Sequence, residues 1–263
     1  MYYKNKNTLI ANSKWFHVPQ PKTNPSLRLF CFSYAGGGPA IYHSWPNDLP
    51  SEIELIAIQL PGRGARMGEP ALDSFEQLVP ALEEAIRPYL DRPFAFFGHS
   101  MGAKLAFELA RHLRHLGRPQ PVHLFASGSR APQEPRNRPN IHAMPREQFR
   151  NELRELNGTP SEILDNNELM SLVEPTLRAD FKAIELYRYA DEKPLSMAIS
   201  AYGGDRDEGV NKEQLLSWRL QTTGSFYAQI LPGDHFFINT AKAVLLHQLS
   251  NTLSLVTKVA AAV

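Results

Sequence analysis

The chain has 263 residues, of which 43% are hydrophobic, and its 28 basic and 27 acidic side chains give a formal net charge of +1. This length suits one α/β domain with an insertion, and the balanced charge gives no electrostatic reason to expect a nucleic-acid partner. No stretch reaches the apolar length of a membrane span, so we expect no membrane partner.

Residues 1–25 lack the apolar run and the cleavage site of a secretory signal. We expect a poorly ordered leader there and a single domain over residues 26–263. The only cysteine, Cys31, cannot form an internal disulfide, and its apolar neighbours favour a buried structural thiol over a nucleophile. We therefore expect a cytoplasmic protein. We also expect a monomer.

Six apolar runs predict β-strands, and apolar residues at helical spacing predict helices between them. Strands that alternate with helices indicate a mostly parallel sheet with helices on both faces. Ser74 and Gln77 are expected to form a capping box at the start of the first helix. The predicted strands are residues 27–33, 53–58, 93–97, 122–127, 197–202 and 226–231, and the predicted helices are residues 74–90, 101–116 and a segment within 236–256.

Residues 130–194 interrupt this alternation with proline-rich loops and two further helical segments, at residues 146–156 and 168–187. An insertion at this point emerges above the carboxyl ends of the strands, where open α/β sheets bind their ligands. We therefore interpret it as a lid rather than as helices that pad the core.

The run Gly98-His99-Ser100-Met101-Gly102 lies between an uncharged predicted strand and an amphipathic helix. A serine at such a sharp turn presents its hydroxyl above the sheet, beside the free N–H groups of the helix. A Cβ at either flanking glycine would collide with the neighbouring strand or helix. A serine that merely begins a helix needs neither glycine, so we interpret Ser100 as a nucleophile. The side chain of His99 is expected to point away and to serve packing or hydrogen bonding.

A nucleophilic serine needs a base, and in this fold class the order along the chain is Ser, then Asp or Glu, then His. His235 and His247 are the two histidines beyond residue 200. We favour His235, because it follows a predicted strand in a short loop, whereas His247 lies among leucines at a helical position.

The orienting carboxylate is expected in the turn Gly203-Gly204-Asp205-Arg206-Asp207-Glu208. We favour Asp207, with Asp205 hydrogen-bonded within the turn, although spacing alone leaves both open.

The oxyanion hole is expected to use the N–H of Met101 and one N–H from the glycine-rich loop at residues 33–38, where we favour Ala35. Phosphate or dinucleotide binding is the rival interpretation of this loop, but the G-x-G-x-x-G pattern and the Walker lysine are absent. We expect neither a metal nor a cofactor.

Five segments follow one another along the chain: Phe32-Ser33-Tyr34-Ala35-Gly36-Gly37, Leu60-Pro61-Gly62-Arg63-Gly64-Ala65-Arg66, Gly98-His99-Ser100-Met101-Gly102-Ala103, Gly203-Gly204-Asp205-Arg206-Asp207 and Pro232-Gly233-Asp234-His235-Phe236-Phe237. Together they resemble the type II thioesterases, the stand-alone editing α/β-hydrolases of polyketide and nonribosomal peptide assembly lines. The likeness spans about residues 27–249. It is more specific than G-x-S-x-G alone, because the elbow is accompanied by Pro-Gly-Arg upstream.

The resemblance implies an α/β-hydrolase fold with a helical lid, and hydrolysis of acyl thioesters on the phosphopantetheine arm of acyl or peptidyl carrier proteins. It assigns the nucleophile to Ser100, the orienting acid to Asp207 and the base to His235. It also assigns the oxyanion N–H groups to Ala35 and Met101. The phosphopantetheine would arrive on the carrier protein, so no cofactor of the enzyme's own is implied.

Other functions share these residues. A free-standing carboxylesterase or lipase with the same triad is the main alternative, an acyltransferase would share the acyl-serine but exclude water, and a binding module would lack a working triad. The Pro-Gly-Arg and Gly-His-Ser-Met-Gly segments favour the thioesterase.

Three further features have simpler interpretations. Ser74 follows Leu72-Asp73 as the modified serine of a carrier protein does, but the chain has no room for a carrier domain. His112 and His115 have a metal-ligand spacing without further ligands nearby, so we interpret them as exposed. An arginine-rich part of the insertion could dock an acidic carrier protein, but we favour a solvated lid surface; its members are Arg130, Arg136, Arg138, Arg146, Arg150 and Arg154.

Overall fold

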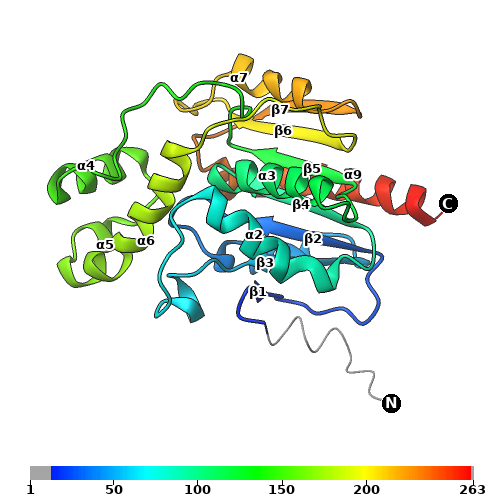
Figure 1. The fold of residues 1–263 in the computed structure, drawn as a ribbon, viewed down its shortest axis with the longest axis horizontal. Helices are drawn as coiled ribbons and strands as arrows, with labels where there is room; N and C mark the ends of the chain where they lie inside the picture. Colours follow the sequence, from blue (N-terminus) through cyan, green and yellow to red (C-terminus); the bar gives the residue numbers. More distant parts are fainter. Residues whose placement is uncertain (1–12, 262–263) are drawn as a thin grey trace.

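Figure 1 shows the computed structural model of the protein, which describes residues 13–261. Seven strands form one sheet in the order β1-β3-β2-β4-β5-β6-β7, and all neighbours are parallel except β1 and β3. The predicted mostly parallel sheet is confirmed. The strands are β1 (Phe16–His17), β2 (Leu27–Phe32), β3 (Ile53–Ile58), β4 (Phe94–His99), β5 (His123–Ser127), β6 (Ala198–Gly204) and β7 (Phe226–Leu231).

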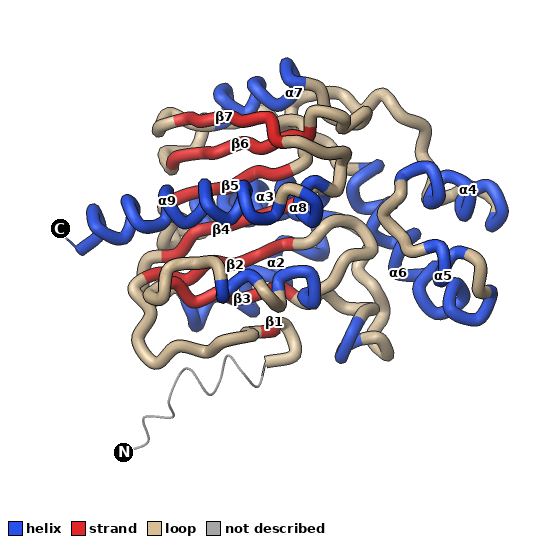
Figure 2. Tube along the Cα trace, turned by 180° about the vertical axis from the view of Figure 1, so that it is seen from behind, coloured by secondary structure: helices blue, strands red, loops and turns tan. Residues whose placement is uncertain are grey.

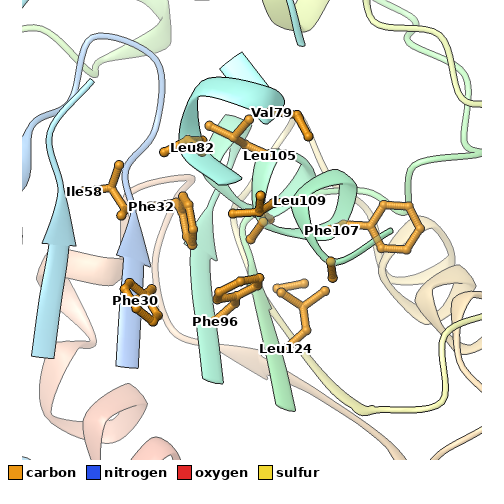
Figure 3. Close-up of a cluster of buried hydrophobic side chains, with 14 of the residues drawn as sticks. Phe30, Phe32, Ile58, Val79, Leu82, Phe96, Leu105, Phe107, Leu109 and Leu124 are labelled. Carbon is orange, nitrogen blue, oxygen red and sulfur yellow. The ribbon is translucent and has the colours of Figure 1, made fainter. Parts of the chain in front are cut away.

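Helices cover both faces of the sheet. On one face, α2 (Phe75–Ile86) and α3 (Met101–His115) pack against the aromatic side chains of β2 and β4, with Leu105 and Leu109 of α3 over Phe32 and Phe96 (Figure 3). On the other, α9 (Lys242–Ala261) runs across the sheet (Figure 2). Residues of β2, β3, β4 and β5 are buried throughout, which is why these strands are mostly apolar rather than alternating; the charged exceptions, Arg28 and Glu54, pair with each other.

The insertion forms α4 (Arg146–Leu156), α5 (Ser161–Leu164) and α6 (Asn167–Leu186). These helices lie beyond the carboxyl ends of the strands, at the left of Figure 1. They have a small apolar cluster of their own, which includes Ile141, Phe149, Leu153, Met170 and Leu177. The insertion therefore packs on itself as well as on the sheet. The short remaining elements are α7 (Lys212–Leu216), α8 (Phe237–Thr240) and five 3-10 helices, Pro39–Tyr42, Trp45–Asn47, Gly64–Arg66, Arg87–Tyr89 and Ser217–Gln221.

Three expectations differ from the structure. Residues 1–12 of the expected leader lie outside the described residues, but Phe16 and His17 form β1, because Phe16 is buried against Phe30 and Tyr89. The capping box at Ser74 is wrong, since that side chain makes no capping bond and the Gln77 side chain accepts instead from the N–H of Asp73. The closing helix is two helices, α8 and α9, with a break at Ala241.

No helix in the described part of the chain has the length and apolar character needed to cross a membrane.

Candidate active site

Ser100 lies at the turn between β4 and α3 with φ 55° and ψ −116°. A positive φ is costly for a residue with a side chain, by about 1–3 kcal/mol, and persists only where the surroundings enforce it. Here the Ser100 N–H donates to the carbonyl of Ser127 at 2.7 Å, which ties the turn to the neighbouring strand. A Cβ on Gly98 would overlap the backbone of α3, and one on Gly102 would overlap the carbonyl of Phe32. The steric reason for the two glycines is thus confirmed.

Three predicted side chains form one chain of hydrogen bonds. His235 Nε2 lies 2.9 Å from Ser100 Oγ, and His235 Nδ1 lies 2.8 Å from Asp207 Oδ2. A carboxylate can only accept, so Nδ1 carries the proton and Nε2 of the neutral ring is free to accept from the serine hydroxyl. The Asp207 side chain is 1% exposed, and its second oxygen accepts from the N–H of Gly209 at 2.8 Å.

The structure separates the two aspartates that the sequence left open. The Asp205 carboxylate accepts from the N–H of Gly233 at 2.8 Å and does not contact His235. It thereby fixes the loop that carries the histidine, which is the turn-bonding role expected for it. His247 lies on α9 and bonds only to Asn251.

The buried side chain of His99 is hydrogen-bonded to the loop that carries His235. Its Nε2 lies 2.9 Å from the carbonyl oxygen of His235 and its Nδ1 lies 2.9 Å from Ser127 Oγ. Because a carbonyl only accepts, Nε2 carries the proton. Burial, followed by the proximity of His235, lowers the pKa of His99 well below the ordinary histidine value, so the ring stays neutral. The expected hydrogen-bonding role is what the contacts show.

The loop after β2 and the start of α3 meet beside Ser100, and Ala35 and Met101 both line the cavity there. Among the described residues, neither N–H bonds to a loop carbonyl or to a side chain. The N–H of Gly36 is already used, because it donates to Asp180 Oδ2 at 2.7 Å. The Ala35 N–H is thus left without a partner in this loop, and its role as an oxyanion donor stays a prediction.

A buried ion pair that the sequence did not reveal fixes this loop. Arg63, from the Pro-Gly-Arg segment, forms a two-bond pair with Asp180 of α6, with both N···O distances 2.7 Å. Arg63 also donates to the carbonyl of Gly37 at 3.0 Å. The Asp180 side chain is completely buried, so the pair is shielded from water and salt. Two partners 117 positions apart, one of them in the insertion, thus hold Gly36 and Gly37 in place.

A cavity of about 400 Å³ opens at Ser100. The sheet side contributes Tyr34, Met101 and His235, and the insertion contributes apolar side chains such as Leu156 and Phe181. The insertion therefore roofs the serine, in keeping with a lid.

The arginine-rich group of the insertion divides in two. Arg130, Arg136 and Arg138 line the cavity, whereas the arginines of α4 are engaged locally. Arg146 pairs with Glu174 and Arg154 with Asp165. The six arginines do not form one free docking face.

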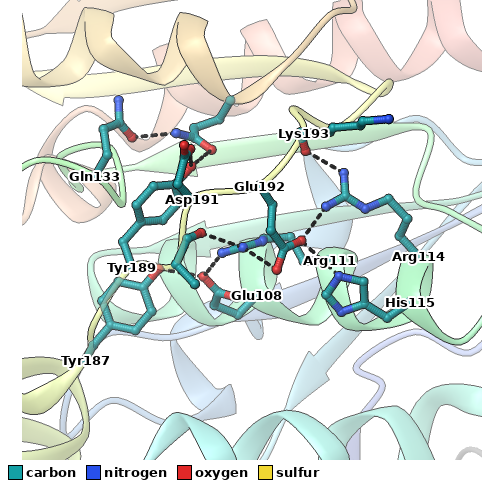
Figure 4. Close-up of polar contacts among 12 residues, drawn as sticks. Glu108, Arg111, Arg114, His115, Gln133, Tyr187, Tyr189, Asp191, Glu192 and Lys193 are labelled. Atoms are coloured by element: carbon teal, nitrogen blue, oxygen red, sulfur yellow. Dashed lines mark hydrogen bonds and ion pairs between the residues drawn. The ribbon is translucent and has the colours of Figure 1, made fainter.

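His112 and His115 do not form a metal site with other side chains, because no cluster of three or more metal-ligating side chains occurs within residues 13–261. His115 instead lies 2.9 Å from Glu192, which also pairs with Arg111 and Arg114 (Figure 4). This network attaches the segment that leaves α6 to the outer face of α3.

Residues 27–252 match the family model of the thioesterase domain. The chain belongs to the thioesterase domain family. It is 44% identical to the gramicidin S biosynthesis protein GrsT of Aneurinibacillus migulanus, over 93% of this chain and 95% of that protein. As a member of this family it is a hydrolase of thioesters, and its fold is that of the α/β-hydrolases.

Two solved structures extend the likeness to three dimensions. RedJ, a thioesterase from the prodiginine pathway of Streptomyces coelicolor, superposes with a TM-score of 0.82 at 38% identity, covering 86% of this chain and 90% of RedJ. YbtT, a type II thioesterase from the yersiniabactin NRPS/PKS pathway, gives 0.81 at 29% identity, covering 90% and 97%. The resemblance to type II thioesterases is confirmed.

We predict that the elbow does not tolerate a methyl group at either glycine. Gly98→Ala or Gly102→Ala should lower the free energy of unfolding by about 3 kcal/mol, because each Cβ would overlap backbone atoms that cannot move aside. Gly68→Ala is the matched control, since a Cβ there meets no atom within 4 Å. Urea denaturation followed by circular dichroism measures all three. Equal stabilities would contradict the steric account.

We also predict that the Arg63–Asp180 pair holds the oxyanion loop. Asp180→Asn should cost about 3–5 kcal/mol of stability, because it leaves a buried guanidinium without its counter-charge. The double variant Arg63→Met, Asp180→Leu should regain only part of that stability, because the Gly36 N–H and the Gly37 carbonyl lose their partners, and it should hydrolyse a thioester about 10–100-fold more slowly, because the loop is no longer held.

The control for this prediction is the exposed ion pair between Lys182 of α6 and Asp73, whose side chains are 42% and 36% exposed. Lys182→Met with Asp73→Leu should change stability by less than about 1 kcal/mol and leave hydrolysis unchanged. Full activity in the Arg63 and Asp180 double variant would show that the buried pair serves folding alone.

Proposed function

We propose that the protein hydrolyses acyl thioesters on the phosphopantetheine arm of acyl or peptidyl carrier proteins, through an acyl-serine formed on Ser100. The unbroken hydrogen-bond chain from Ser100 through His235 to Asp207, at the floor of a roofed cavity, is the observation that carries this proposal. GrsT is named for gramicidin S biosynthesis, RedJ for the prodiginine pathway and YbtT for the yersiniabactin NRPS/PKS pathway, which supports a carrier-bound substrate.

The geometry accounts for each step of such a reaction. His235 Nε2 takes the proton of Ser100 as Oγ attacks the thioester carbonyl, and the buried Asp207 stabilises the imidazolium that results. The N–H groups of Met101 and Ala35 donate to the oxyanion of the tetrahedral intermediate. When the C–S bond breaks, the imidazolium returns the proton to the thiolate, and the acyl group stays on Oγ.

Deacylation repeats these steps with water as the nucleophile. His235 removes a proton from water, which attacks the acyl-serine carbonyl, and the same two N–H groups hold the second oxyanion. Collapse of this intermediate gives the proton back to Ser100 Oγ and releases a carboxylic acid. Residues 13–261 contain no cluster suited to a metal, and none of these steps uses one.

The substrate class is tested by comparing turnover of an acyl carrier protein thioester with that of the matching oxygen ester. We expect kcat/KM for the carrier thioester to exceed that for the ester, and Ser100→Ala to abolish both reactions. A higher kcat/KM for the oxygen ester would favour a carboxylesterase. A Ser100→Ala variant that keeps most of its activity would contradict the proposed nucleophile.

The two neighbouring aspartates offer a matched pair for the acid. Asp207→Asn should lower kcat by about 10³–10⁴-fold, because an amide favours the wrong tautomer of His235. Asp205→Asn should have a much smaller effect, because that side chain bonds to the Gly233 N–H and not to the imidazole. Equal losses in the two variants, measured on the same thioester, would contradict the assignment.

A further inference from the structure

One charged side chain of the cavity is used neither by the proposed mechanism nor by the fold. Lys104 lies on α3 one turn beyond Met101, so both residues face the same side of the helix, and both line the cavity. Lys104 is 4% exposed. It is also the only lysine, arginine, aspartate or glutamate between Arg92 and Glu108, within an otherwise uncharged segment.

The ammonium group of Lys104 has no hydrogen bond and no ion pair with any described residue; its Nζ lies 5.4 Å from the centroid of the Tyr187 ring. The carboxylate one turn further along α3, Glu108, is already engaged by the Tyr187 hydroxyl and by Arg111. A buried amine without a partner is costly and is usually paired or neutralised. Lys104 is thus an amine in the wall of the cavity that has no hydrogen-bond or ion-pair partner among the described residues.

The charges around Lys104 increase this cost. Burial, followed by the positive charges of Arg130 and Arg136, lowers the pKa of Lys104 to about 7, and no carboxylate offsets these effects. Arg130 is itself partly buried and forms no ion pair with a described residue; burial, followed by Arg136 and Arg138, lowers its pKa, and Glu134 offsets this only in part. Arg136 is partly neutralised by Glu185 at 3.0 Å. Several cations therefore converge on one wall of the cavity with too few anions among them.

The carboxylates that line the cavity do not pair with Lys104. Asp207 is bonded to His235, and the Asp234 side chain accepts from the N–H of Phe236. Glu155 and Glu208 also line the cavity, but neither contributes to the pKa of Lys104. An anion delivered with the substrate would satisfy the amine and relieve the repulsion between Lys104 and the two arginines.

We propose that Lys104, with Arg130 beside it, binds a carboxylate carried by the acyl group of the substrate, so that the enzyme accepts acyl chains with an acidic end. The proposal rests on the proposed function for the identity of the substrate, and adds to it the chemical class of the acyl chain. Lys104 is a specificity residue here, not a member of the proton-transfer chain. A phosphate is the other anion that a pantetheine substrate carries, and the experiment distinguishes the two.

The kinetic test uses two thioesters of N-acetylcysteamine, succinyl and butyryl, which carry no phosphate. We expect Lys104→Met to lower kcat/KM for succinyl by about 10–100-fold, because it removes a charge-assisted bond, and to leave butyryl unchanged or faster. Lys212→Met, the same change at an exposed residue of α7 outside the cavity lining, should alter neither. An unchanged ratio of succinyl to butyryl in Lys104→Met would overturn the proposal.

A binding test does not depend on turnover. Succinate should raise the Tm of the wild-type protein more than butyrate or inorganic phosphate does, and this difference should disappear in Lys104→Met and in Lys104→Gln. Stabilisation by phosphate alone, or equal stabilisation by succinate and butyrate, would overturn the carboxylate site. A wild type that binds succinate but hydrolyses neither thioester would instead count against the proposed function and leave the site standing.

Discussion

The backbone turn at Ser100 is the constraint on which the rest of the site depends. At such a turn the hydroxyl is presented above the sheet, and both Ser100 and the following residue, Met101, line the cavity. The surrounding structure enforces this strained conformation. β4 and α3 approach so closely here that Gly98 and Gly102 have no space for a side chain. The other parts of the site are then placed by loops at the same edge of the sheet, after β2, β6 and β7.

The insertion is joined to this edge and is more than a cover. Its longest helix, α6, contacts the sheet-side loops at three points: Asp180 pairs with Arg63, Thr176 donates to the carbonyl of Gly62, and Lys182 pairs with Asp73. Asp180 also accepts from the Gly36 N–H, so α6 holds the backbone of that loop next to Ala35. The roof of the cavity and the loop at residues 33–38 are therefore connected by direct bonds.

Much of this could be predicted from the sequence, because the sheet strands are apolar runs and the elbow is a local pattern whose steric cause lies within five residues. Spacing alone did not distinguish Asp205 from the favoured Asp207, since both follow the same glycine pair and only their partners, Gly233 and His235, differ. The Arg63–Asp180 pair could not be predicted from the sequence either, because only the tertiary fold brings these two distant segments together. Lys104 stands out as a lone charge in the sequence, but its lack of a partner depends on everything packed around it.

The central claim is that the acyl group passes through a covalent bond to Ser100. Rapid acid quenching of the wild-type enzyme during its first turnover of an acyl thioester, followed by peptide mass mapping, tests it directly. We predict a peptide containing Ser100 that carries the mass of the acyl group and loses it at the rate of turnover. An acyl group on another side chain, or product released while the protein stays unmodified throughout the first turnover, would contradict the account.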